Sequence, residues 1–366
     1  MKHSLREEAV STTWMFTKVF DTDLVSAPWM GRDAEAWRSL EQTRLARVIA
    51  RLASFSTGFF SKCLRTMEAA RELTYEGEAF ATRLLVTNDV ASISSIAGES
   101  FRPLNKRISI DDAISEKWVR AFTRQGTIAL VVATRRTTVG GVLVLPDTSA
   151  DCPQGLHASI DQVERFVTPG VAMIAATQNG DIWVRLGNGM AFLRRRGHWQ
   201  FFDLEVVRAV LLPHMPAPVL DALLRLAIDA SFERRGALFG VLNDSSTIRE
   251  VVPDTKSSAR SNRGLRELIA HLDITKELWR PVIRSAAMID GAVLLTNDGL
   301  VLDAACIAVE PSAARRAELG IAKWPSFPGA RSTAARNVSV YGVAIKISDD
   351  GPISVFVAGA LRVEIG

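Results

Sequence analysis

The sequence predicts an α/β protein, with a mixed sheet flanked by helices in its C-terminal part and an α+β domain before it. Short β-branched runs bounded by Gly, Asn, Asp or Pro recur from about residue 79 onward and predict strands. Amphipathic runs at helical spacing alternate with such strands after residue 218. The 366 residues are 48% hydrophobic and 23% charged. This composition suits two globular domains and excludes a disordered or fibrous chain.

The N-terminal domain is predicted to cover residues 1–205. Residues 1–33 show no clear period, and apolar residues at helical spacing predict helices over 33–54 and 58–73. Strands are predicted over 79–86, 127–134, 140–145, 171–176, 181–186 and 190–195. Asn179-Gly180 and Asn188-Gly189 predict hairpin turns. The sheet region shows no internal repeat, and the domain resembles no family we can name. We expect a sensor or regulatory domain, by analogy of architecture alone.

The second domain is predicted to cover residues 218–366, after a proline-rich connector at 206–217. Helices are predicted over 218–235, 263–272 and 276–285, with a polar loop at 245–261. Strands are predicted over 237–242, 292–296, 300–309, 343–347 and 353–357. Asn297-Asp298-Gly299 and Asp349-Asp350-Gly351 predict the hairpin turns between strand pairs.

Several classes of protein are not favoured by the sequence. The longest apolar stretches fall short of a membrane-spanning helix, and residues 1–8 lack the apolar core of a signal peptide. The three cysteines are too widely spaced for a disulfide framework or a metal site, so we expect a cytoplasmic protein without a membrane partner. The net charge is +4, and the basic run Arg194-Arg195-Arg196 is typical of a solvated or ion-paired hairpin. No nucleic-acid partner is expected.

The first motif with chemical potential is Asp290-Gly291-Ala292, at the head of a predicted strand. An acid followed by two small residues leaves its carboxylate accessible and lets a ligand approach the backbone. Such a carboxylate can bind a metal ion or accept a proton from a hydroxyl. The same residues also fit a plain turn before a strand, and both interpretations remain open at this point.

The second motif runs from Gly329 to Ala335 and reads G-A-R-S-T-A-A. A loop of this composition that enters a helix can hold phosphate, because backbone N–H groups and the helix dipole favour an anion and Arg331 can bind oxygens bidentately. An ordinary helix start is the alternative. The third motif, Ser348-Asp349-Asp350-Gly351, is by itself a hairpin turn.

In this order and spacing the motifs resemble the diadenylate cyclase (DAC, DisA_N-type) domain, over about residues 218–366. The residues that carry the resemblance are Arg234-Arg235-Gly236-Ala237-Leu238, Asp290-Gly291-Ala292, Gly299, Ala304-Ala305-Cys306, Gly329, Arg331, Ala334-Ala335 and Ser348-Asp349-Asp350-Gly351. Residues 353–359 also fit the end of such a domain.

The resemblance implies an enzyme that condenses two ATP into cyclic di-AMP and two pyrophosphates. Two such domains would face each other in a homodimer or higher homo-oligomer, each holding one ATP, with Mg²⁺ or Mn²⁺ as cofactor. The implied catalytic residues are Asp290, Gly291, Ala292 and Arg331. The implied nucleotide-binding residues are Ala305, Cys306, Ile307, Gly329, Arg331, Ser332, Thr333 and Ser348. The implied metal ligands are Asp290, Asp349 and Asp350.

The sequence also departs from that family. Its phosphate motif commonly reads R-H-R, where this chain has Arg331-Ser332-Thr333, and Ile289 stands where a histidine is common. Loss of a cation beside a polyphosphate weakens stabilisation of the transition state. The alternatives are therefore a catalytically weak or inactive nucleotide-binding sensor of the same fold, or a module that only dimerises. Cations that would replace the missing charge are Arg284, Arg315, Arg316, Lys323 or Arg336.

Overall fold

The computed structural model divides the chain into two compact units. Unit 1 comprises residues 1–147 and 159–200, and unit 2 comprises residues 148–158 and 201–366. The residues described are 15, 17–19, 34–70, 73–75, 78–79, 82–124, 128–134, 137–145, 163, 165–177, 179–253, 263–321 and 324–366. Most of residues 1–33, part of the polar loop at 245–261, and Lys323 lie outside this range. Each unit is described by itself.

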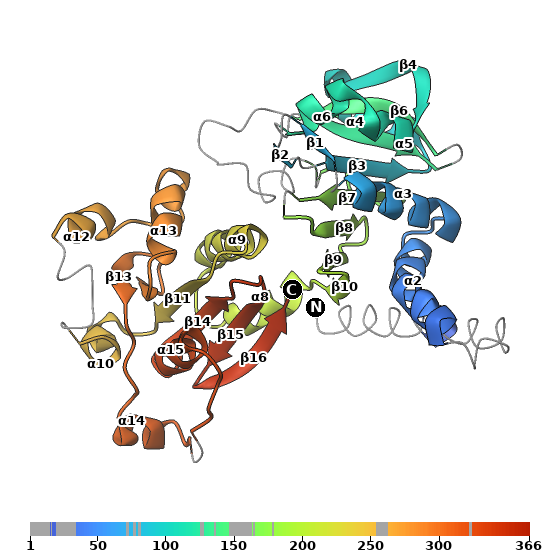
Figure 1. Ribbon diagram of the computed structural model, residues 1–366. Coiled ribbons are helices and arrows are strands. Elements are labelled where there is room, and N and C mark those ends of the chain that lie inside the picture. Colours follow the sequence, from blue (N-terminus) through green and yellow to red (C-terminus); the bar gives the residue numbers. More distant parts are fainter. Residues whose placement is uncertain are drawn as a thin grey trace. The chain divides into compact units, whose positions relative to one another are not determined.

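Unit 1 is built on an eight-stranded mixed sheet in the order β10-β9-β8-β7-β3-β5-β6-β4 (Figure 1). The strands are β3 (Thr82–Thr87), β4 (Phe101–Ser109), β5 (Ile128–Ala133), β6 (Thr138–Val144), β7 (Val171–Ala176), β8 (Ile182–Leu186), β9 (Ala191–Arg195) and β10 (His198–Phe201). The strands β3 and β5 run parallel, whereas β3–β7, β5–β6, β4–β6, β7–β8 and β8–β9 are antiparallel pairs. A separate two-stranded ribbon joins β1 (Thr74–Tyr75) and β2 (Glu78–Ala79).

Helices bury the apolar side of this sheet. They are α2 (Ala34–Leu52), α3 (Thr57–Ala70), α4 (Val90–Ala97), α5 (Ile110–Ser115) and α6 (Lys117–Arg124). Phe60 and Met67 of α3 share one core cluster with Leu84, Val132 and Ile174 of the sheet. The intervening residues Leu85, Val131 and Met173 are buried as well, so both faces of the central strands are covered.

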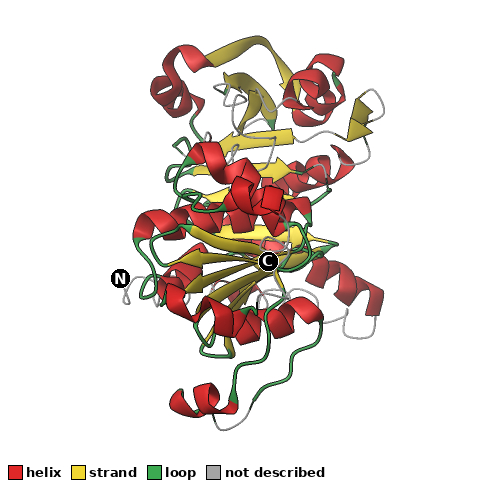
Figure 2. Ribbon diagram, turned by 90° about the vertical axis from the view of Figure 1, so that its left-hand side faces the viewer, coloured by secondary structure: helices red, strands yellow, loops and turns green. Residues whose placement is uncertain are grey.

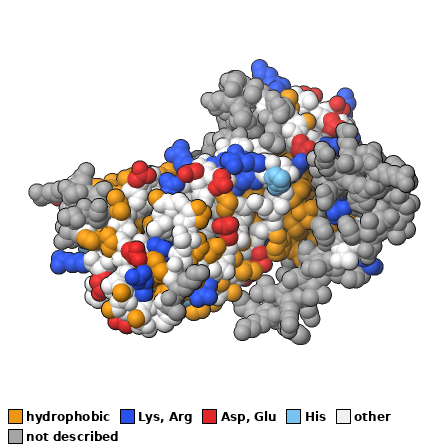
Figure 3. All heavy atoms as spheres, turned by 60° about the horizontal axis from the view of Figure 1, so that its bottom comes forward, with side chains coloured by type: hydrophobic (Ala, Val, Ile, Leu, Met, Phe, Trp, Pro, Cys, Tyr) orange, Lys and Arg blue, Asp and Glu red, His pale blue; other side chains and the backbone are white. Residues whose placement is uncertain are grey.

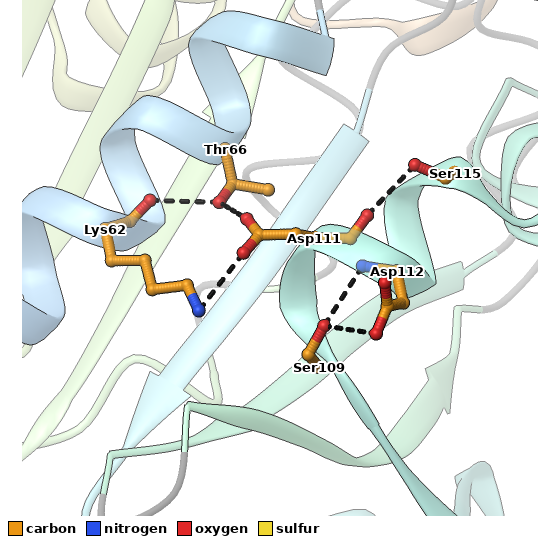
Figure 4. A network of polar contacts seen from close by, with 6 residues as sticks. All are labelled: Lys62, Thr66, Ser109, Asp111, Asp112 and Ser115. Carbon is orange, nitrogen blue, oxygen red and sulfur yellow. Dashed lines mark hydrogen bonds and ion pairs between the residues drawn. The ribbon is translucent and has the colours of Figure 1, made fainter.

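A polar network fixes α3 against α5 at the rim of that core. The carboxylate of Asp111 accepts hydrogen bonds from the hydroxyl of Thr66 and from Lys62 Nζ, the latter at 3.1 Å (Figure 4). Burial alone would raise the pKa of Asp111, but the hydrogen bonds from Thr66 and Lys62 outweigh it and hold this pKa below its ordinary value. The Ser109 hydroxyl accepts from the Asp112 N–H at 3.2 Å and so caps α5.

Unit 2 is built on a six-stranded mixed sheet in the order β13-β12-β11-β14-β15-β16. The strands are β11 (Ala237–Leu242), β12 (Ala292–Thr296), β13 (Val301–Cys306), β14 (Gly342–Ile347), β15 (Ile353–Val357) and β16 (Ala360–Ile365). The strands β11 and β12 run parallel, and the other neighbours are antiparallel.

Two longer helices, α9 (Ala217–Glu233) and α15 (Ala330–Val338), cover opposite faces of this sheet (Figure 1), and Figure 2 shows strands lying between helices. The α15 residues Ala335 and Val338 share a core cluster with Leu238 of β11 and Ala344 of β14. A Cβ at Gly240 would overlap Val338, so glycine lets α15 approach β11 closely. The remaining helices of unit 2 are α8 (Leu204–Leu211), α10 (Ile248–Val251), α12 (Arg263–Ile269), α13 (Arg280–Ala287) and α14 (Ala313–Glu318).

The structure confirms the predicted α/β class and the predicted strands, to within a few residues at their ends. Several elements differ from the expectation, among them the strand β10 and the helices α4, α5 and α6, which were not predicted. The strands β4 and β16 were not predicted, and the first half of the predicted connector at 206–217 is helical, because α8 is capped by Asp203 and packs against β16. Asp203 Oδ1 accepts from the N–H of Glu205 at 2.9 Å, a capping signal that the prolines nearby obscured.

Candidate functional site

The sheet topology of unit 2 brings the three motifs to one edge. The parallel strands β11 and β12 begin at this edge, and the antiparallel strands β13 and β14 end at it. Phe239 pairs with Val293, so continuing the register places Gly236 beside Asp290. With neighbouring strands about 4.8 Å apart, the Asp290 position on β12 and the Asp349 turn after β14 are about 10 Å apart. A nucleoside triphosphate can span this distance.

Asp290 is exposed and precedes β12 directly. Its carboxylate has no side-chain hydrogen bond or ion pair within the described part of the chain. Gly291 follows with φ +123°, and a Cβ there would lie 2.5 Å from the carbonyl carbon of Ala305 and 2.6 Å from the Cys306 nitrogen. Glycine is therefore required for the close approach of two backbones.

The strand predicted to lie against adenine is adjacent to this glycine. Ala292 pairs with Cys306, and the side chains of Ala292, Ala305 and Cys306 are buried. Only their backbone groups are in a position to read a base at this edge. Ile307, the next residue, is 57% exposed and offers apolar surface.

A clamp of three residues forms on the other side of β11. Asp349 accepts a hydrogen bond from the Gly236 N–H at 2.8 Å and another from Arg331 Nη1 at 2.7 Å, one on each carboxylate oxygen. A Cβ at Gly236 would overlap both the Arg331 guanidinium and the Asp349 carboxylate. We call Gly236, Arg331 and Asp349 the arginine clamp. It orients Arg331 and leaves its remaining N–H donors for another anion.

The first turn of α15 lies beside the clamp. Its N-cap is Gly329, with φ +86° and no side-chain capping bond, so the first N–H groups of the helix have no side-chain acceptor there. Ser332 is buried and its hydroxyl accepts from Lys346 Nζ at 3.2 Å. Thr333 donates its hydroxyl back to the Phe327 carbonyl at 3.4 Å. The hydroxyls of Ser332 and Thr333 are thus engaged within the protein.

Lys346 is a cation of the site that the sequence did not reveal. It lies on β14, paired with Leu238 of β11, and is half-buried beside Ser332. The sequence signal for Lys346 was a single lysine inside an otherwise apolar strand. A charge at such a position is costly unless it has a polar partner. Gly236 is the other site residue whose role the sequence did not predict, although it belongs to the motifs that carry the resemblance.

The cations proposed as replacements for the missing charge have other partners. Arg284 pairs with Glu233 at 2.8 Å, Arg315 with Glu318 at 2.8 Å, and Arg316 with Glu310 at 2.9 Å. Arg336 is buried under the Trp324 ring, 4.3 Å from its centroid, and desolvation lowers its pKa. Arg336 therefore anchors the segment before α15. Lys346 takes the place expected for the replacement cation.

The metal prediction fits the structure only in part. No group of three or more His, Cys, Asp or Glu side chains is arranged to hold a metal ion among the residues described. Both oxygens of Asp349 are already bound within the arginine clamp, which does not fit a metal ligand. Asp350 is exposed in the turn. Asp290 does fit, since Mg²⁺ commonly takes one or two protein carboxylates and completes its shell with substrate phosphates and water.

The basic run in unit 1 is ion-paired. Arg194 pairs with Glu68, and Arg195 forms a buried pair with Asp181 at 3.0 Å. Acidic and basic side chains are interspersed on the face drawn in Figure 3. Both ion pairs join residues of unit 1.

Comparison with known proteins yields no family. No protein-family model matches the chain, and no curated protein matches it. Among solved structures, similarity is found to a hypothetical membrane spanning protein from Bacillus cereus, with 21% identity, a TM-score of 0.31, and 44% of this chain and 68% of that chain covered. A double mutant of DacA from Staphylococcus aureus, a diadenylate cyclase, gives 17% identity and a TM-score of 0.25, over 39% of this chain and 84% of that chain. At these values neither likeness carries an argument.

Helix length and polarity were also compared with the thickness of a bilayer. No helix among the described residues is long and apolar enough to cross a membrane.

Proposed function

We propose that unit 2 binds ATP and condenses two ATP molecules into cyclic di-AMP and two pyrophosphates. The observation that supports this is the convergence of Asp290, the arginine clamp and the open first turn of α15 on one sheet edge. These groups supply what phosphoryl transfer requires, namely a carboxylate for the attacking hydroxyl and donors for the leaving phosphates. The motif resemblance points to the same reaction.

In this proposal Asp290 orients the 3′-hydroxyl of its ATP and accepts the hydroxyl proton. An exposed carboxylate without a protein partner is suited to this role, because it is free to approach the ribose. The 3′-oxygen forms a bond to the α-phosphorus of the facing ATP, and the bond from that phosphorus to the pyrophosphate oxygen breaks. Arg331, with the first-turn N–H groups of α15, binds the departing pyrophosphate, whose negative charge increases during transfer.

Asp349 is a positioning residue in this scheme, because it holds Arg331 and does not face the phosphates itself. Lys346 supplies a second cation behind Ser332. A Mg²⁺ or Mn²⁺ ion held by Asp290 would supply charge neutralisation when bound. The two nucleotides face each other in a homodimer or larger homo-oligomer in the cytoplasm.

The direct test uses ATP labelled at the α-phosphate, with product separation in Mg²⁺ and Mn²⁺. Cyclic di-AMP is expected from the wild type and not from Asp290→Asn. Recovery of unreacted ATP alone, at protein concentrations that permit pairing, would overturn the enzyme proposal.

A second candidate function is a nucleotide sensor without turnover. It is favoured by one observation, that Ser332 and Thr333 direct their hydroxyls to protein partners where the motif more commonly supplies a histidine and an arginine. Calorimetry with ATP separates the two functions. Binding that Arg331→Ala abolishes, without product formation, supports the sensor.

A further inference from the structure

Unit 1 and unit 2 share one strand topology. In both, a central strand pairs with a parallel neighbour on one side and with an antiparallel strand on the other. The strand parallel to the central strand pairs on its far side with an antiparallel strand. The strand antiparallel to the central strand is followed by a meander of at least two further strands. The equivalent strands are β3 and β11, β5 and β12, β6 and β13, β7 and β14, β8 and β15, and β9 and β16.

The two sheets agree in the register of their residue pairs and also in their strand order. On the antiparallel side six residue pairs join the central strand to its neighbour in each unit, from Thr82 with Ala176 to Thr87 with Val171, and from Ala237 with Ile347 to Leu242 with Gly342. On the parallel side the first pair starts at the third residue of the central strand in both units. These first pairs are Leu84 with Leu130 and Phe239 with Val293.

An irregularity of the sheet also recurs. Between β5 and β6 the register shifts by one residue after Val131, so that Gly140 is skipped. Between β12 and β13 it shifts once between Ala292 and Leu294, which has no counterpart between β5 and β6, and again after Leu294, where Leu302 is skipped. Given the alignment above, Val131 and Leu294 are equivalent positions. A bulge at the same place in two ladders is a designed feature of a fold and is not expected by chance.

Two turns match in their hydrogen bonds. The central strand is followed by Asn-Asp in both units, and Asp89 and Asp244 each have φ −134°. Asp89 accepts from Ala91 N at 2.9 Å, and Asp244 accepts from Ser246 N at 2.8 Å. These are the same capping bond two residues ahead.

The hairpin after β7 matches the hairpin after β14. The Thr177 N–H donates to the Asp181 carbonyl and the Gly180 N–H to the Thr177 carbonyl, both at 2.9 Å. In unit 2 the Ser348 N–H donates to the Pro352 carbonyl and the Gly351 N–H to the Ser348 carbonyl, also at 2.9 Å. Gly180 and Gly351 both have positive φ, which this turn requires.

From these agreements we infer that the chain contains two copies of one fold, and that the described residues of the first copy do not form the nucleotide site proposed for the second. The second part of this inference rests on the proposed function of unit 2. One chain then binds one nucleotide, and a pair of facing nucleotide sites requires a second copy of this chain.

The residues at the equivalent edge of unit 1 explain the loss. Where unit 2 has Gly291-Ala292, unit 1 has Ile128-Ala129, and the residue before them in the sequence is Thr127, which lies outside the described residues. Ile128 has a bulky side chain, 6% exposed, that belongs to the core cluster beneath the helices. The backbone approach that Gly291 permits is therefore not reproduced, and in the sequence a hydroxyl residue stands in place of the carboxylate.

At the same edge, the residues around the hairpin after β7 also differ from those around the hairpin after β14. Asp181, at the position of Pro352, is fully buried and paired with Arg195 at 3.0 Å. A buried ion pair of this kind is a fixed structural contact. Ala175 stands at the position of Lys346, and the cation of this cross-strand pair is instead Arg83 on the central strand, where it is buried.

The first test counts nucleotides. The full-length chain is dialysed against a labelled ATP analogue with a methylene group between its α- and β-phosphorus atoms, which blocks turnover. We expect one analogue bound per chain in the wild type and none in Arg331→Ala. Two per chain, or one per chain retained in Arg331→Ala, would show a site in unit 1 and overturn the inference. None in the wild type would overturn both the one-site count and the proposed function.

The second test does not depend on nucleotide. In a crystal structure of the full-length chain, the strands β3, β5, β7 and β8 should superpose on β11, β12, β14 and β15 with the residue pairs given above. A different strand order in unit 1 would overturn the shared fold even if unit 2 binds ATP. Superposition together with no binding would leave the duplication intact and reject the proposed function alone.

Discussion

The two units share their strand arrangement at one edge of the sheet, and at this edge their side chains differ in chemistry. Both place the starts of two parallel strands and a positive-φ hairpin at one edge. In unit 2 this edge carries an exposed carboxylate, a glycine against backbone and a clamped arginine. In unit 1 the same edge carries Ile128 and a buried Arg195–Asp181 pair. The strand order is thus a scaffold, and a few residues at one edge decide whether it holds chemistry.

The largest expected effect comes from the carboxylate. Asp290→Asn removes the proton acceptor and is expected to lower cyclic di-AMP formation by at least about 100-fold. The matched change in unit 1, Thr127→Ala, is expected to leave the rate unchanged. Initial rates with labelled ATP measure both. Equal losses in the two variants would contradict the assignment of the chemistry to unit 2 alone.

Glycine-to-alanine substitutions should have opposite effects on the stability of the two units. At Gly291, φ +123° and a backbone atom 2.5 Å from the added Cβ mean that Gly291→Ala should destabilise unit 2 by about 3 kcal/mol. Gly58 lies in α3 with open space around it, so Gly58→Ala should stabilise unit 1 by about 0.5–1 kcal/mol. Urea unfolding measures both changes. A neutral Gly291→Ala would show that the contact with Ala305 is not tight.

Removing the second cation should weaken nucleotide binding without unfolding the site. Lys346→Met keeps the length of the side chain but loses the charge beside Ser332. We expect an affinity for ATP lower by about tenfold, which is about 1.4 kcal/mol. Calorimetry gives the affinity, and Arg249→Met, an exposed residue of α10 beyond the opposite end of β11, serves as the charge-matched control. An equal drop in the control would indicate a general effect of net charge.

The smallest effect is a pH dependence of unit 1. The pKa of Asp111 is lower in the folded state than in an unfolded chain, so its interactions stabilise unit 1 above the unfolded pKa and are lost as the pH falls through the folded pKa. Asp111 is half exposed, so the contribution stays below about 1 kcal/mol. Asp111→Asn should therefore reduce stability at pH 7 and have little effect near pH 2. Thermal melts across this range measure it, and a constant difference would contradict the assignment.

The sequence predicted most strands, because their β-branched runs and Asn-Gly or Asp-Gly turns are local signals. It did not predict β16, whose apolar residues are interrupted by Arg362 and Glu364, since it is an outer strand paired on one side. It also gave no sign of the duplication. Pairing register and a bulge are specified by tertiary contacts, and few residues are identical between the two copies, among them the Asn-Asp turn, a turn glycine, Ala129 with Ala292, and Val86 with Val241.

The candidate site was predictable as a set of motifs, and its geometry was not. The motifs around Asp290, Arg331 and Asp349 each have a local signature. That Asp349 holds Arg331, and that Lys346 lies beside Ser332, depends on residues brought together by β14 and α15. The metal role expected for Asp349 stays a prediction, and the sequence could not show that each of its oxygens already accepts a hydrogen bond within the arginine clamp.

The arginine clamp affects the rate at which an anion associates with Arg331. Arg331 is a long side chain whose rotamers would otherwise interconvert in solvent, and its bond to Asp349 selects one of them before any ligand arrives. The entropy lost in ordering this guanidinium is therefore incurred during folding and not during association. A preorganised donor of this kind lets an incoming anion meet a fixed target, at the expense of part of the local positive potential.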